Sequence, residues 1–431
     1  MAKRKESDSI APSADNGLSV LSSIMSKVDK DITTLSETSY AKIDDYISTG
    51  SYILNACVSG SLFKGVPNRR IVTFVGEEGT GKTFLALSVC REAQKKGYTP
   101  IYIDTEASID PDFVIRLGVD PNKMMVKAIN TIQELTQFIA QLISQLEEHQ
   151  ANGKEVPKII LVIDSIGNLS SEKEMDDAIA GKGTADMTKQ RLLRSFFRIN
   201  GVKMSKLGMS VVLISHVYEA IGSYVPTKKV SGGGGILFNS SSIMMLSKSK
   251  LEDKNNDAAA SKKTEDAVNN GVKVTVKPVK SRFCKPIKVS VHIPFYTKLN
   301  PYVGLEKYIS WENCGIMRGK CLTAKEYEKL SSSEQNTCHS FTDKNGDTLY
   351  ALPKDKARTL VCKHLGGEVD LIKLFTPQVL SQEVLEELDN KVIKPLFELP
   401  TLFDENMDES MLNELVNDSS TEINDEENIV M

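Results

Sequence analysis

A phosphate-binding loop between a strand and a helix constrains this chain more than any other feature. Residues 71–87 begin with a β-branched apolar run, pass through a glycine-rich loop and end in helix-forming residues. The pattern G-x-x-x-x-G-K-S/T is matched there by Gly76, Gly81, Lys82 and Thr83. A glycine-rich turn that binds no nucleotide is the alternative, and the runs on both sides of the loop disfavour it.

The residue types of this loop suit a nucleoside triphosphate with Mg²⁺. Its glycines can adopt positive φ, so backbone N–H groups can point at phosphate oxygens, and the helix from Lys82 adds its positive dipole end. Lys82 would reach the β and γ phosphates, and the Thr83 hydroxyl would ligate Mg²⁺. The expected phosphate site comprises Gly76, Glu77, Glu78, Gly79, Thr80, Gly81, Lys82 and Thr83.

Apolar runs alternate with helical segments from the loop onward. The runs at 71–75, 101–104, 159–164 and 210–215 are rich in Val, Ile and Leu, which indicates strands buried on both faces. A helix between the second and third runs carries an apolar stripe of Ile132, Leu135, Phe138, Ile139, Leu142, Ile143 and Leu146. This alternation predicts an α/β fold around a mainly parallel sheet. We expect later runs at 243–246, 272–276 and 289–293 to extend it in antiparallel fashion, and 251–270 to be a surface insertion.

Two acidic residues follow neighbouring predicted strands. Asp164 ends a fully apolar run, where open α/β sheets bind ligands. We interpret it as the carboxylate that holds the Mg²⁺ ligated by Thr83, through water. Glu106 lies at the end of the second strand, where it could orient or deprotonate an attacking water. Each acid alone could be a helix N-cap or a turn residue, but together with the loop they predict a hydrolytic site.

The charge of the chain is distributed unevenly. The net charge is −4, yet residues 201–300 hold 16 Lys and Arg against 6 Asp and Glu, and 11 acidic but no basic residues follow Lys394. A basic middle suits a polyanion such as nucleic acid, and a solvated charged face is the equal alternative. We expect the acidic tail to be disordered, and to compete for that basic patch or recruit a partner.

A short amphipathic helix is predicted near the start of the chain, after a disordered stretch at 1–14. Leu18, Leu21, Met25 and Val28 repeat there at helical spacing, and a polar Thr/Ser stretch separates them from the rest. An isolated helix of this length is marginal in water. It therefore packs either on the body of this chain or on a neighbouring subunit.

The remaining composition excludes several classes of protein. The 7 cysteines fit no C-x-x-C or zinc-type spacing, so we interpret them as reduced, structural thiols. The polar N-terminus shows no apolar signal segment, and no stretch approaches the length that spans a bilayer. These features predict a soluble, cytoplasmic protein.

The ordered set of motifs resembles the RecA recombinase family. After the phosphate loop come Y-I-D-T-E at 102–106, I-D-P-D-F with L-G-V-D, I-I-L-V-I-D-S at 159–165 and V-V-L-I-S-H at 211–216. His216, V-S-G-G-G-G at 230–235, K-S-R at 280–282 and N-P-Y-V-G-L at 300–305 are more similar to the UvsX recombinases of T4-like phages. The resemblance covers about 15–320, whereas the C-terminal part matches only in general character.

The resemblance implies roles for individual residues at the nucleotide. Lys82, Thr83 and Asp164 would bind MgATP, and Glu106 would activate water. Asp110 and Phe113 match adenine-contacting positions, although Phe replaces the commoner Tyr. His216 stands where RecA carries a Gln that senses the γ-phosphate; a structural His is the alternative.

Further roles implied by the resemblance concern the subunit interface and DNA. Lys280 and Arg282 match a basic pair that reaches the neighbour's ATP, where cations stabilise the transition state; a solvent-facing strand of alternating Lys is the alternative. DNA would bind at 170–187 and 217–235 and on the intervening helix, with broad single-strand preference and strong salt dependence. The DNA-binding candidates are Lys182, Arg191, Arg198, Lys228, Lys229, Gly232, Gly233, Gly234 and Gly235.

The sequence thus predicts a RecA-like P-loop ATPase core with an N-terminal helix arm and a small C-terminal domain. The expected parts are 1–40 with the oligomerisation helix, the core at 41–310, a C-terminal domain of helical pattern at 311–395, and the tail at 396–431. The implied function is an ATP- and Mg²⁺-dependent filament on single-stranded DNA that pairs it with homologous duplex DNA and exchanges strands, with single-strand-binding and mediator proteins as further partners. A hexameric helicase of the same core fold and a non-catalytic mediator are the rival functions.

Overall fold

The computed structural model describes residues 14–29, 32, 34–35, 38, 42–181, 188–219, 228–230, 233–248, 271–295 and 297–399 of the 431-residue chain. By its contacts the chain divides into two units, Met1–Ile43 and Asp44–Met431. The first contains helix α1 (Ala14–Val28), which confirms the predicted N-terminal helix. Leu18, Leu21 and Val28 of this helix are exposed. The expectations for 1–13, 251–270 and 400–431 lie outside the described residues.

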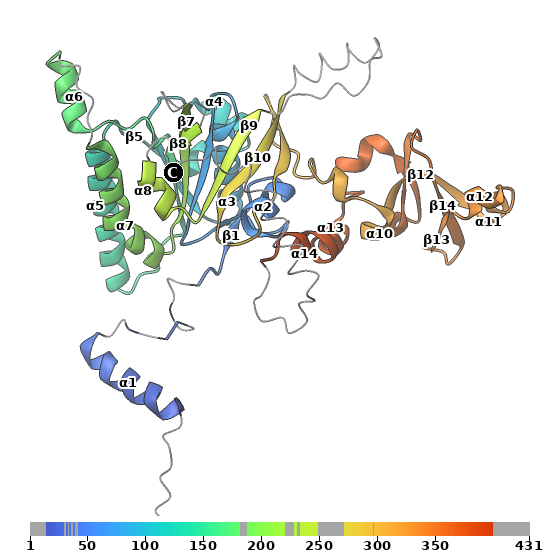
Figure 1. The fold of residues 1–431 in the computed structure, drawn as a ribbon, viewed down its shortest axis with the longest axis horizontal. Helices are drawn as coiled ribbons and strands as arrows, with labels where there is room; N and C mark the ends of the chain where they lie inside the picture. The colour runs from blue at the N-terminus through green and yellow to red at the C-terminus, as the bar shows by residue number, and fades with distance from the viewer. Residues whose placement is uncertain are drawn as a thin grey trace, which may run out of the picture. The chain divides into compact units, whose positions relative to one another are not determined.

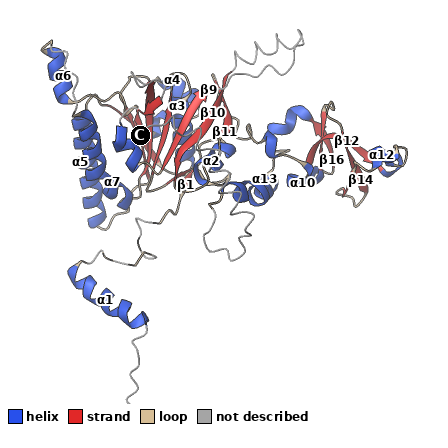
Figure 2. Cartoon of the chain, viewed as in Figure 1, coloured by secondary structure: helices blue, strands red, loops and turns tan. Residues whose placement is uncertain are grey.

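The second unit is built on a 9-stranded sheet with the order β11-β10-β9-β3-β7-β6-β4-β5, and β8 pairs with β7 (Figures 1 and 2). The strands from β9 to β5 along this order run parallel, whereas β8, β10 and β11 are antiparallel to their neighbours. The predicted α/β class with a mainly parallel sheet is confirmed. The strands are β3 (Ile71–Gly76), β4 (Thr99–Asp104), β5 (Met125–Ala128), β6 (Ile159–Asp164), β7 (Ser210–Glu219), β8 (Lys228–Val230), β9 (Ser242–Lys248), β10 (Gly271–Ser281) and β11 (Val289–Pro294).

Helices cover both faces of this sheet and enclose two apolar cores. The apolar stripe predicted on α5 faces the sheet together with residues of α7, including Phe196 and Phe197. Helices α2 and α3 lie on the other side of the sheet from α5 and α7 (Figure 1), and their buried residues belong to the second core. The helices of this part are α2 (Tyr52–Ser59), α3 (Lys82–Lys95), α4 (Pro111–Arg116), α5 (Ile132–Ala151), α6 (Glu172–Ile179), α7 (Lys189–Lys206) and α8 (Gly233–Asn239); β1 (Tyr46–Ile47) pairs with β2 (Val66–Pro67), and Pro121–Lys123 and Glu306–Tyr308 form 3₁₀ turns.

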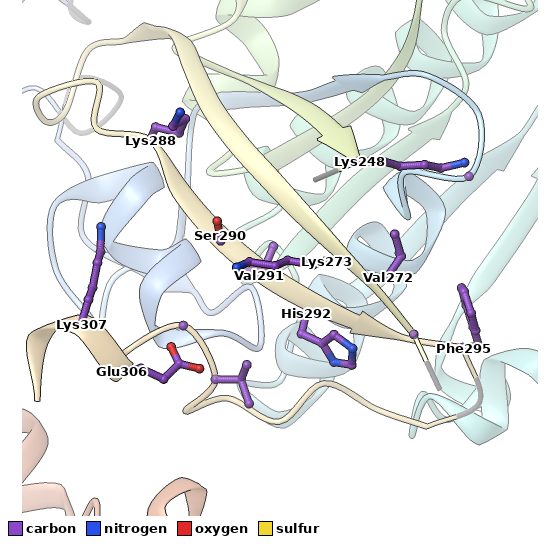
Figure 3. A pocket seen from close by; sticks show the side chains of 14 residues that line it. Lys248, Val272, Lys273, Lys288, Ser290, Val291, His292, Phe295, Glu306 and Lys307 are labelled. Carbon is purple, nitrogen blue, oxygen red and sulfur yellow. The ribbon is translucent and has the colours of Figure 1, made fainter. Parts of the chain in front are cut away.

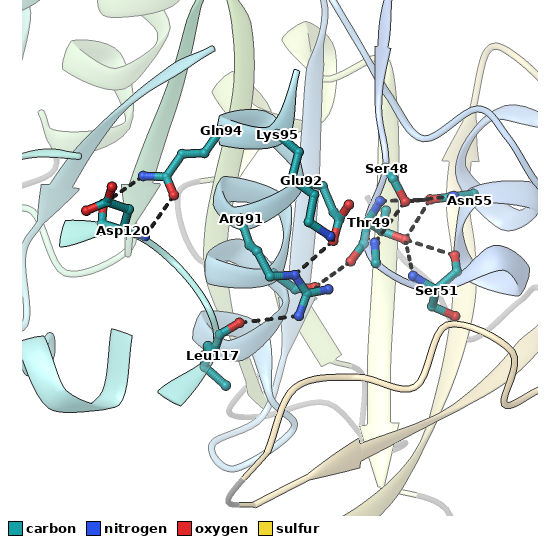
Figure 4. A network of polar contacts seen from close by, with 12 residues as sticks. Ser48, Thr49, Ser51, Asn55, Arg91, Glu92, Gln94, Lys95, Leu117 and Asp120 are labelled. Carbon is teal, nitrogen blue, oxygen red and sulfur yellow. Dashed lines mark hydrogen bonds and ion pairs between the residues drawn. The ribbon is translucent and has the colours of Figure 1, made fainter. Parts of the chain in front are cut away.

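A polar network joins α3 to the segments beside it (Figure 4). The Arg91 guanidinium donates to the Leu117 carbonyl oxygen (3.3 Å) and to Ser88 Oγ (3.3 Å), and Ser88 donates to the Thr49 carbonyl oxygen (2.8 Å). Thr49 in turn donates to Asn55 Oδ1 of α2 (2.8 Å). Because these groups are buried and satisfied, they fix how α2 and α3 lie against each other.

Strand β9 corrects one expectation about the sheet. The run at 243–246 was expected to be antiparallel, yet β9 pairs with β3 in parallel, with Thr73 opposite Ile243. The short helix α8 lies between β7 and β9 along the chain and returns it to the same strand direction, as crossovers do. Strands β10 and β11 are antiparallel as predicted.

The C-terminal part corrects another expectation. The helical pattern expected at 311–395 is wrong for much of this segment, because it contains a 5-stranded antiparallel sheet of order β13-β14-β12-β15-β16. Its strands are short, and burial does not alternate regularly along β12, β14 and β15, so the period of two that identifies a strand is weak there. The elements are α10 (Trp311–Cys314), β12 (Ile316–Thr323), α11 (Ala324–Tyr327), α12 (Ser332–Gln335), β13 (His339–Thr342), β14 (Thr348–Pro353), β15 (Thr359–Cys362), β16 (Gly367–Asp370), α13 (Gln382–Leu388), a π-helical turn (Asp389–Ile393) and α14 (Lys394–Phe397), with 3₁₀ turns at Lys363–Leu365 and Leu371–Phe375.

The last helical segment is held on the body of the second unit by a buried carboxylate. Asp389 accepts from Ser61 Oγ (2.7 Å) and from the Leu62 amide (2.7 Å), and the Lys285 amide donates to the Phe397 carbonyl oxygen (2.8 Å).

All 7 cysteines are free thiols, as the sequence predicted. No helix within the described ranges is long and apolar enough to cross a membrane.

Candidate functional site

Strand register brings the predicted nucleotide residues to one edge of the sheet. Gly76 at the end of β3 lies opposite His216 of β7, and Asp104 of β4 lies opposite Asp164 of β6. Parallel strands present their carboxyl ends at the same edge, where open α/β sheets bind ligands. The phosphate loop, both predicted acids and His216 therefore meet at what we name the carboxyl edge.

The phosphate loop has the backbone that an anion site requires. Gly81 adopts φ 80° and caps the N-terminus of α3. A Cβ on Gly76 would lie 2.7 Å from Thr80 Oγ1 and 2.8 Å from the Leu246 carbonyl oxygen, so a larger residue does not fit there. Residues 77–79 at the tip of the loop are exposed. The loop thus combines a fixed, tightly packed base with an open outer side.

Lys82 is a buried cation at the start of α3. Only 6% of the residue is exposed, and its ammonium donates to the Glu77 carbonyl oxygen (2.8 Å). Burial lowers the pKa of Lys82, and the carboxylates of Asp164 and Glu106 oppose this only in part. The neighbouring carboxylates therefore balance the charge of Lys82 only in part. A buried cation of this kind is suited to bind an anion such as phosphate.

Thr83 and Asp164 supply two oxygen ligands of the kind that Mg²⁺ prefers. Thr83 Oγ1 donates to Asp164 Oδ2 (2.6 Å), and the Tyr102 hydroxyl donates to the same oxygen (2.6 Å). Burial raises the pKa of Asp164, although the Thr83 and Tyr102 hydrogen bonds lower it. The described residues hold no group of three His, Cys, Asp or Glu that could bind a metal alone. The pair therefore fits Mg²⁺ that is also held by phosphate and water.

Glu106 lies in a turn shaped by the buried Asp104. The Asp104 carboxylate accepts from the amides of Glu106 (3.0 Å) and Ser108 (3.4 Å). Glu106 Oε1 accepts from Asn168 Nδ2 (2.8 Å) and lies 3.0 Å from His216 Nε2. Burial raises the pKa of Glu106, but the hydrogen bond with His216 and the charge of Lys82 lower it below its ordinary value. Its ionised, half-exposed carboxylate can accept a proton from water.

The predicted adenine-contacting pair lies on the short helix α4. Asp110 is the N-cap of this helix and accepts from the Phe113 amide (3.0 Å). The Phe113 ring packs in part against the core, and the Arg116 guanidinium lies 6.0 Å from its centroid. Helix α4 is the next element after β4, whose last residue lies at the carboxyl edge. The chain therefore enters α4 from the edge that also carries the phosphate loop.

Lys280 and Arg282 do not lie beside the loop of their own chain. Lys280 pairs with Ile243, which pairs with Thr73, and the Arg282 amide donates to the Ser241 carbonyl oxygen next to the start of β3. Three residues along β3 separate this register from Gly76, or about 10 Å at the rise of a strand. Lys280 Nζ donates to the Leu237 carbonyl oxygen (2.6 Å), and burial and Arg282 lower its pKa. Within one chain this pair lies toward the amino edge of the sheet.

The DNA-binding candidates are described only in part. Arg191 and Arg198 are exposed on α7, where they line a cavity of about 440 Å³ together with Arg194. The stretch at 170–187 contains α6, and β8 carries the backbone of Lys228 and Lys229. Lys182, Gly232 and the side chains of Lys228 and Lys229 lie outside the described residues.

The glycines of the second candidate loop have a packing role as well. Gly233, Gly234 and Gly235 begin α8, and a Cβ on Gly235 would lie 3.2 Å from the Arg194 amide nitrogen of α7. Small residues at this point allow α8 to approach α7 closely. The expected freedom of these glycines to approach DNA stays a prediction.

Several candidate residues escaped the sequence analysis. Tyr102 is a phenol within an apolar strand, and Asn168 follows Asp164 by only four positions; both signals were present in the sequence. Lys248 approaches the loop so closely that a Cβ on Gly79 would lie 3.0 Å from its ammonium. This ammonium borders a cavity of about 950 Å³ with basic walls, shown in Figure 3. The basic residues that line it are Lys248, Lys273, Lys288, His292 and Lys307.

Comparisons with known proteins agree with this geometry. The family model of the RecA N-terminal domain matches residues 19–298. The chain is 31% identical to the protein RecA of Rhodopirellula baltica over 178 residues, 41% of this chain and 44% of that protein. It is 25% identical to the protein RecA of Mesoplasma florum over 314 residues, 71% of this chain and 84% of that protein. It is 28% identical to the recombination and repair protein of Enterobacteria phage T4 over 178 residues, 41% and 43% of the two chains. Two of these matches thus span less than half of the relative.

Proposed function

This chain belongs to the RecA family, and we propose that it is a DNA-dependent ATPase that forms a filament on single-stranded DNA and catalyses homologous pairing and strand exchange. The observation that carries the proposal is the division of the site between two edges of one sheet. The carboxyl edge holds Lys82, Thr83, Asp164 and Glu106, whereas Lys280 and Arg282 lie toward the amino edge. A neighbouring subunit can supply the missing cations, which makes hydrolysis depend on assembly.

The residues of the carboxyl edge would hold MgATP. The loop amides and the N-terminus of α3 bind the phosphates, and Lys82 donates to the terminal ones. Thr83 and Asp164 would hold Mg²⁺, which neutralises phosphate charge when bound. Asp110 and Phe113 would contact the base, Phe113 through the face of its ring.

Glu106 would act as the general base. Its carboxylate is ionised at neutral pH and would take a proton from the attacking water. His216 contacts this carboxylate and begins the segment that leads to the second DNA loop. Its position between Glu106 and the candidate loop supports a sensor role. In this role, both the bound nucleotide and DNA at the loop would change the contact between His216 and Glu106.

DNA would lie along the arginines of α7 and the two loops that flank this helix. Arg191, Arg194 and Arg198 recur at helical spacing on one side of α7, which suits the repeating charge of a phosphate backbone. Such contacts are largely independent of sequence. Homologous duplex DNA is the second substrate of this proposal, and single-strand-binding and mediator proteins are further partners.

The first test measures ATP hydrolysis with and without single-stranded DNA across a salt series. We expect strong stimulation that weakens as salt rises, because phosphate contacts release counterions. Filaments by electron microscopy and joint molecules with homologous duplex DNA would then support the recombinase. Ring-shaped particles with unwinding activity would instead support a helicase of the same fold, and hydrolysis indifferent to DNA would reject both.

A further inference from the structure

Two side chains from different strand ends meet on one oxygen of Glu106. Asn168 Nδ2 donates to Glu106 Oε1 (2.8 Å), and His216 Nε2 lies 3.0 Å from the same oxygen. The carboxylate and the imidazole are only partly exposed, at 27% and 33%. The terminal torsion of a Glu side chain is broad, so one partner orients it poorly. Two partners on Oε1 fix the plane of the carboxylate and leave Oε2 as the oxygen that they do not occupy.

The backbone that carries Asn168 is held rigidly. The Ser165 amide donates to Thr105 Oγ1 (2.8 Å), and Thr105 Oγ1 donates to the Ser165 carbonyl oxygen (2.9 Å). The Ile166 amide donates to the Ile214 carbonyl oxygen (2.9 Å). Thr105 directly precedes Glu106. Its two hydrogen bonds with Ser165 therefore connect the segment that carries Glu106 to the segment that carries Asn168. This rigidity allows the amide of Asn168 to hold a defined position.

Asn168 also lies just before the first candidate DNA loop. The candidate loop at 170–187 begins two residues after Asn168, and Lys189, beyond that loop, donates to the Gly167 carbonyl oxygen (3.0 Å). His216 lies in β7, one residue before the second candidate loop at 217–235. Glu106 Oε1 is therefore the point at which residues just before both candidate loops meet.

We propose that Asn168 is a positioning residue that orients the Glu106 carboxylate and links it to the first DNA loop, an inference that rests on the proposed function. The neutral amide donates without exchanging a proton, so it orients the base and takes no part in proton transfer. His216 contributes the equivalent contact from β7, the strand that leads to the second candidate loop. When DNA binds at either candidate loop, the two contacts change together at one oxygen and set the orientation of the base.

The test compares Asn168→Ala, Asn168→Gln and Asn168→Asp in the full chain. We expect Asn168→Ala to lower the DNA-stimulated kcat about fivefold to tenfold with KM for ATP nearly unchanged, since the base remains and only its orientation is lost. Asn168→Gln keeps the donor at an exposed position and should restore part of kcat. Asn168→Asp should lose more, because it places a like charge beside Glu106. The charge-matched control is Asn122→Asp, at an exposed position beyond α4.

A double-mutant cycle separates positioning from a general structural role. If Asn168 acts through Glu106, Asn168→Ala has no further effect in a Glu106→Gln background. Additive losses, a change confined to KM, or an Asn168→Ala variant as active as the wild type would overturn the inference. The wild type in the same series tests the proposed function separately. If DNA does not stimulate hydrolysis by the wild type, the recombinase proposal fails, and the role of Asn168 is then judged by comparing the unstimulated kcat of Asn168→Ala with that of the wild type. A wild type that hydrolyses no ATP overturns both proposals.

Discussion

Two aspartates near opposite ends of β6 have side-chain pKa values that are shifted in opposite directions. Asp164 ends β6 at the carboxyl edge and accepts from the hydroxyls of Thr83 and Tyr102. Asp45 lies beside the amino ends of β4 and β6, where it contacts Lys96, Tyr98 and Lys158. Burial raises the pKa of both carboxyls, but only around Asp45 do the lysine and hydroxyl partners reverse the shift and lower it.

This difference separates groups that stabilise the fold from groups that bind a ligand. Around Asp45 the chain provides its own countercharges, so folding satisfies this carboxylate. At the carboxyl edge Lys82 and Asp164 keep charges that the chain compensates only in part. Uncompensated charge costs stability and is retained where a ligand supplies the rest. Substitutions of Asp45 and of the carboxyl-edge residues should therefore affect different properties.

The largest effect is expected for Lys82→Ala. Loss of the cation that would bind the terminal phosphates should lower ATP hydrolysis about 100- to 1,000-fold. The unfolding temperature of the ligand-free protein should not fall, because burial already disfavours this charge. Hydrolysis assays and thermal melts of the same preparation check both statements.

The control for this substitution is Lys95→Ala at the other end of α3. Lys95 is 62% exposed and pairs with Glu92 on the surface, so its removal should leave hydrolysis unchanged. A Lys82→Ala protein that unfolds at a lower temperature yet hydrolyses ATP normally would contradict the assignment of this edge to ligand binding.

Trans complementation tests whether Lys280 and Arg282 act on a neighbour. Lys280→Ala/Arg282→Ala should lower DNA-stimulated hydrolysis about 100-fold or more while leaving DNA binding intact. When this double variant is mixed in equal amounts with Lys82→Ala, hydrolysis should return at about a quarter of the interfaces. These are the interfaces at which the double variant supplies an intact phosphate loop and Lys82→Ala supplies Lys280 and Arg282. Hydrolysis of each protein alone and of the mixture is measured on single-stranded DNA.

The matched control for the mixture pairs the double variant with Glu106→Gln/Lys280→Ala/Arg282→Ala, in which no interface contains Lys280 and Arg282. Activity should stay at the level of the double variant alone. If the Lys82→Ala mixture also shows no gain, the two halves do not combine across subunits and the filament mechanism fails.

Local patterns predicted which residues would meet at the carboxyl edge, because each of these motifs is contiguous in sequence. The loop, the run that ends in Asp164 and the Y-I-D-T-E segment each carry their signal within a few residues. The parallel sheet then brings their ends together by a general rule of the fold. The separation of Lys280 from Gly76 depends instead on the register of β10, β9 and β3, which no local pattern contains.

The failures have similar physical reasons. The contact of Asn168 with Glu106 depends on a side-chain direction across two strand ends, and a polar residue in a loop gives no period to read. The strands of the C-terminal sheet are 4–8 residues long, and burial does not alternate regularly along β12, β14 and β15, so the period of two is weak. Strand β9 was misassigned because α8 is short and opens with glycines.

A smaller effect at the carboxyl edge is expected for Tyr102→Phe. The hydroxyl donates to Asp164 Oδ2, and its loss should raise the pKa of Asp164 further. Because the ionised carboxylate would hold Mg²⁺, half-maximal hydrolysis should need about tenfold more Mg²⁺, with a larger deficit at pH 6 than at pH 8. Tyr98→Phe removes a hydroxyl from Asp45 instead and should leave the Mg²⁺ dependence unchanged. An unchanged Mg²⁺ dependence in Tyr102→Phe would show that the hydroxyl does not support the metal ligand.

The smallest effect is expected for Asp45→Asn, and it should appear in stability alone. Removal of the charge weakens the contacts with Lys96, Tyr98 and Lys158 and should cost roughly 1 kcal/mol of the free energy of unfolding at pH 7. The folded-state pKa of Asp45 is lowered, so this contribution is fully present above about pH 4 and is lost as the pH falls through the folded-state value. Urea melts of both proteins from pH 7 to pH 3 should therefore converge at the acid end. Hydrolysis at neutral pH should be unaltered, and a loss of hydrolysis without a loss of stability would contradict the distinction between Asp45 and the carboxyl-edge residues.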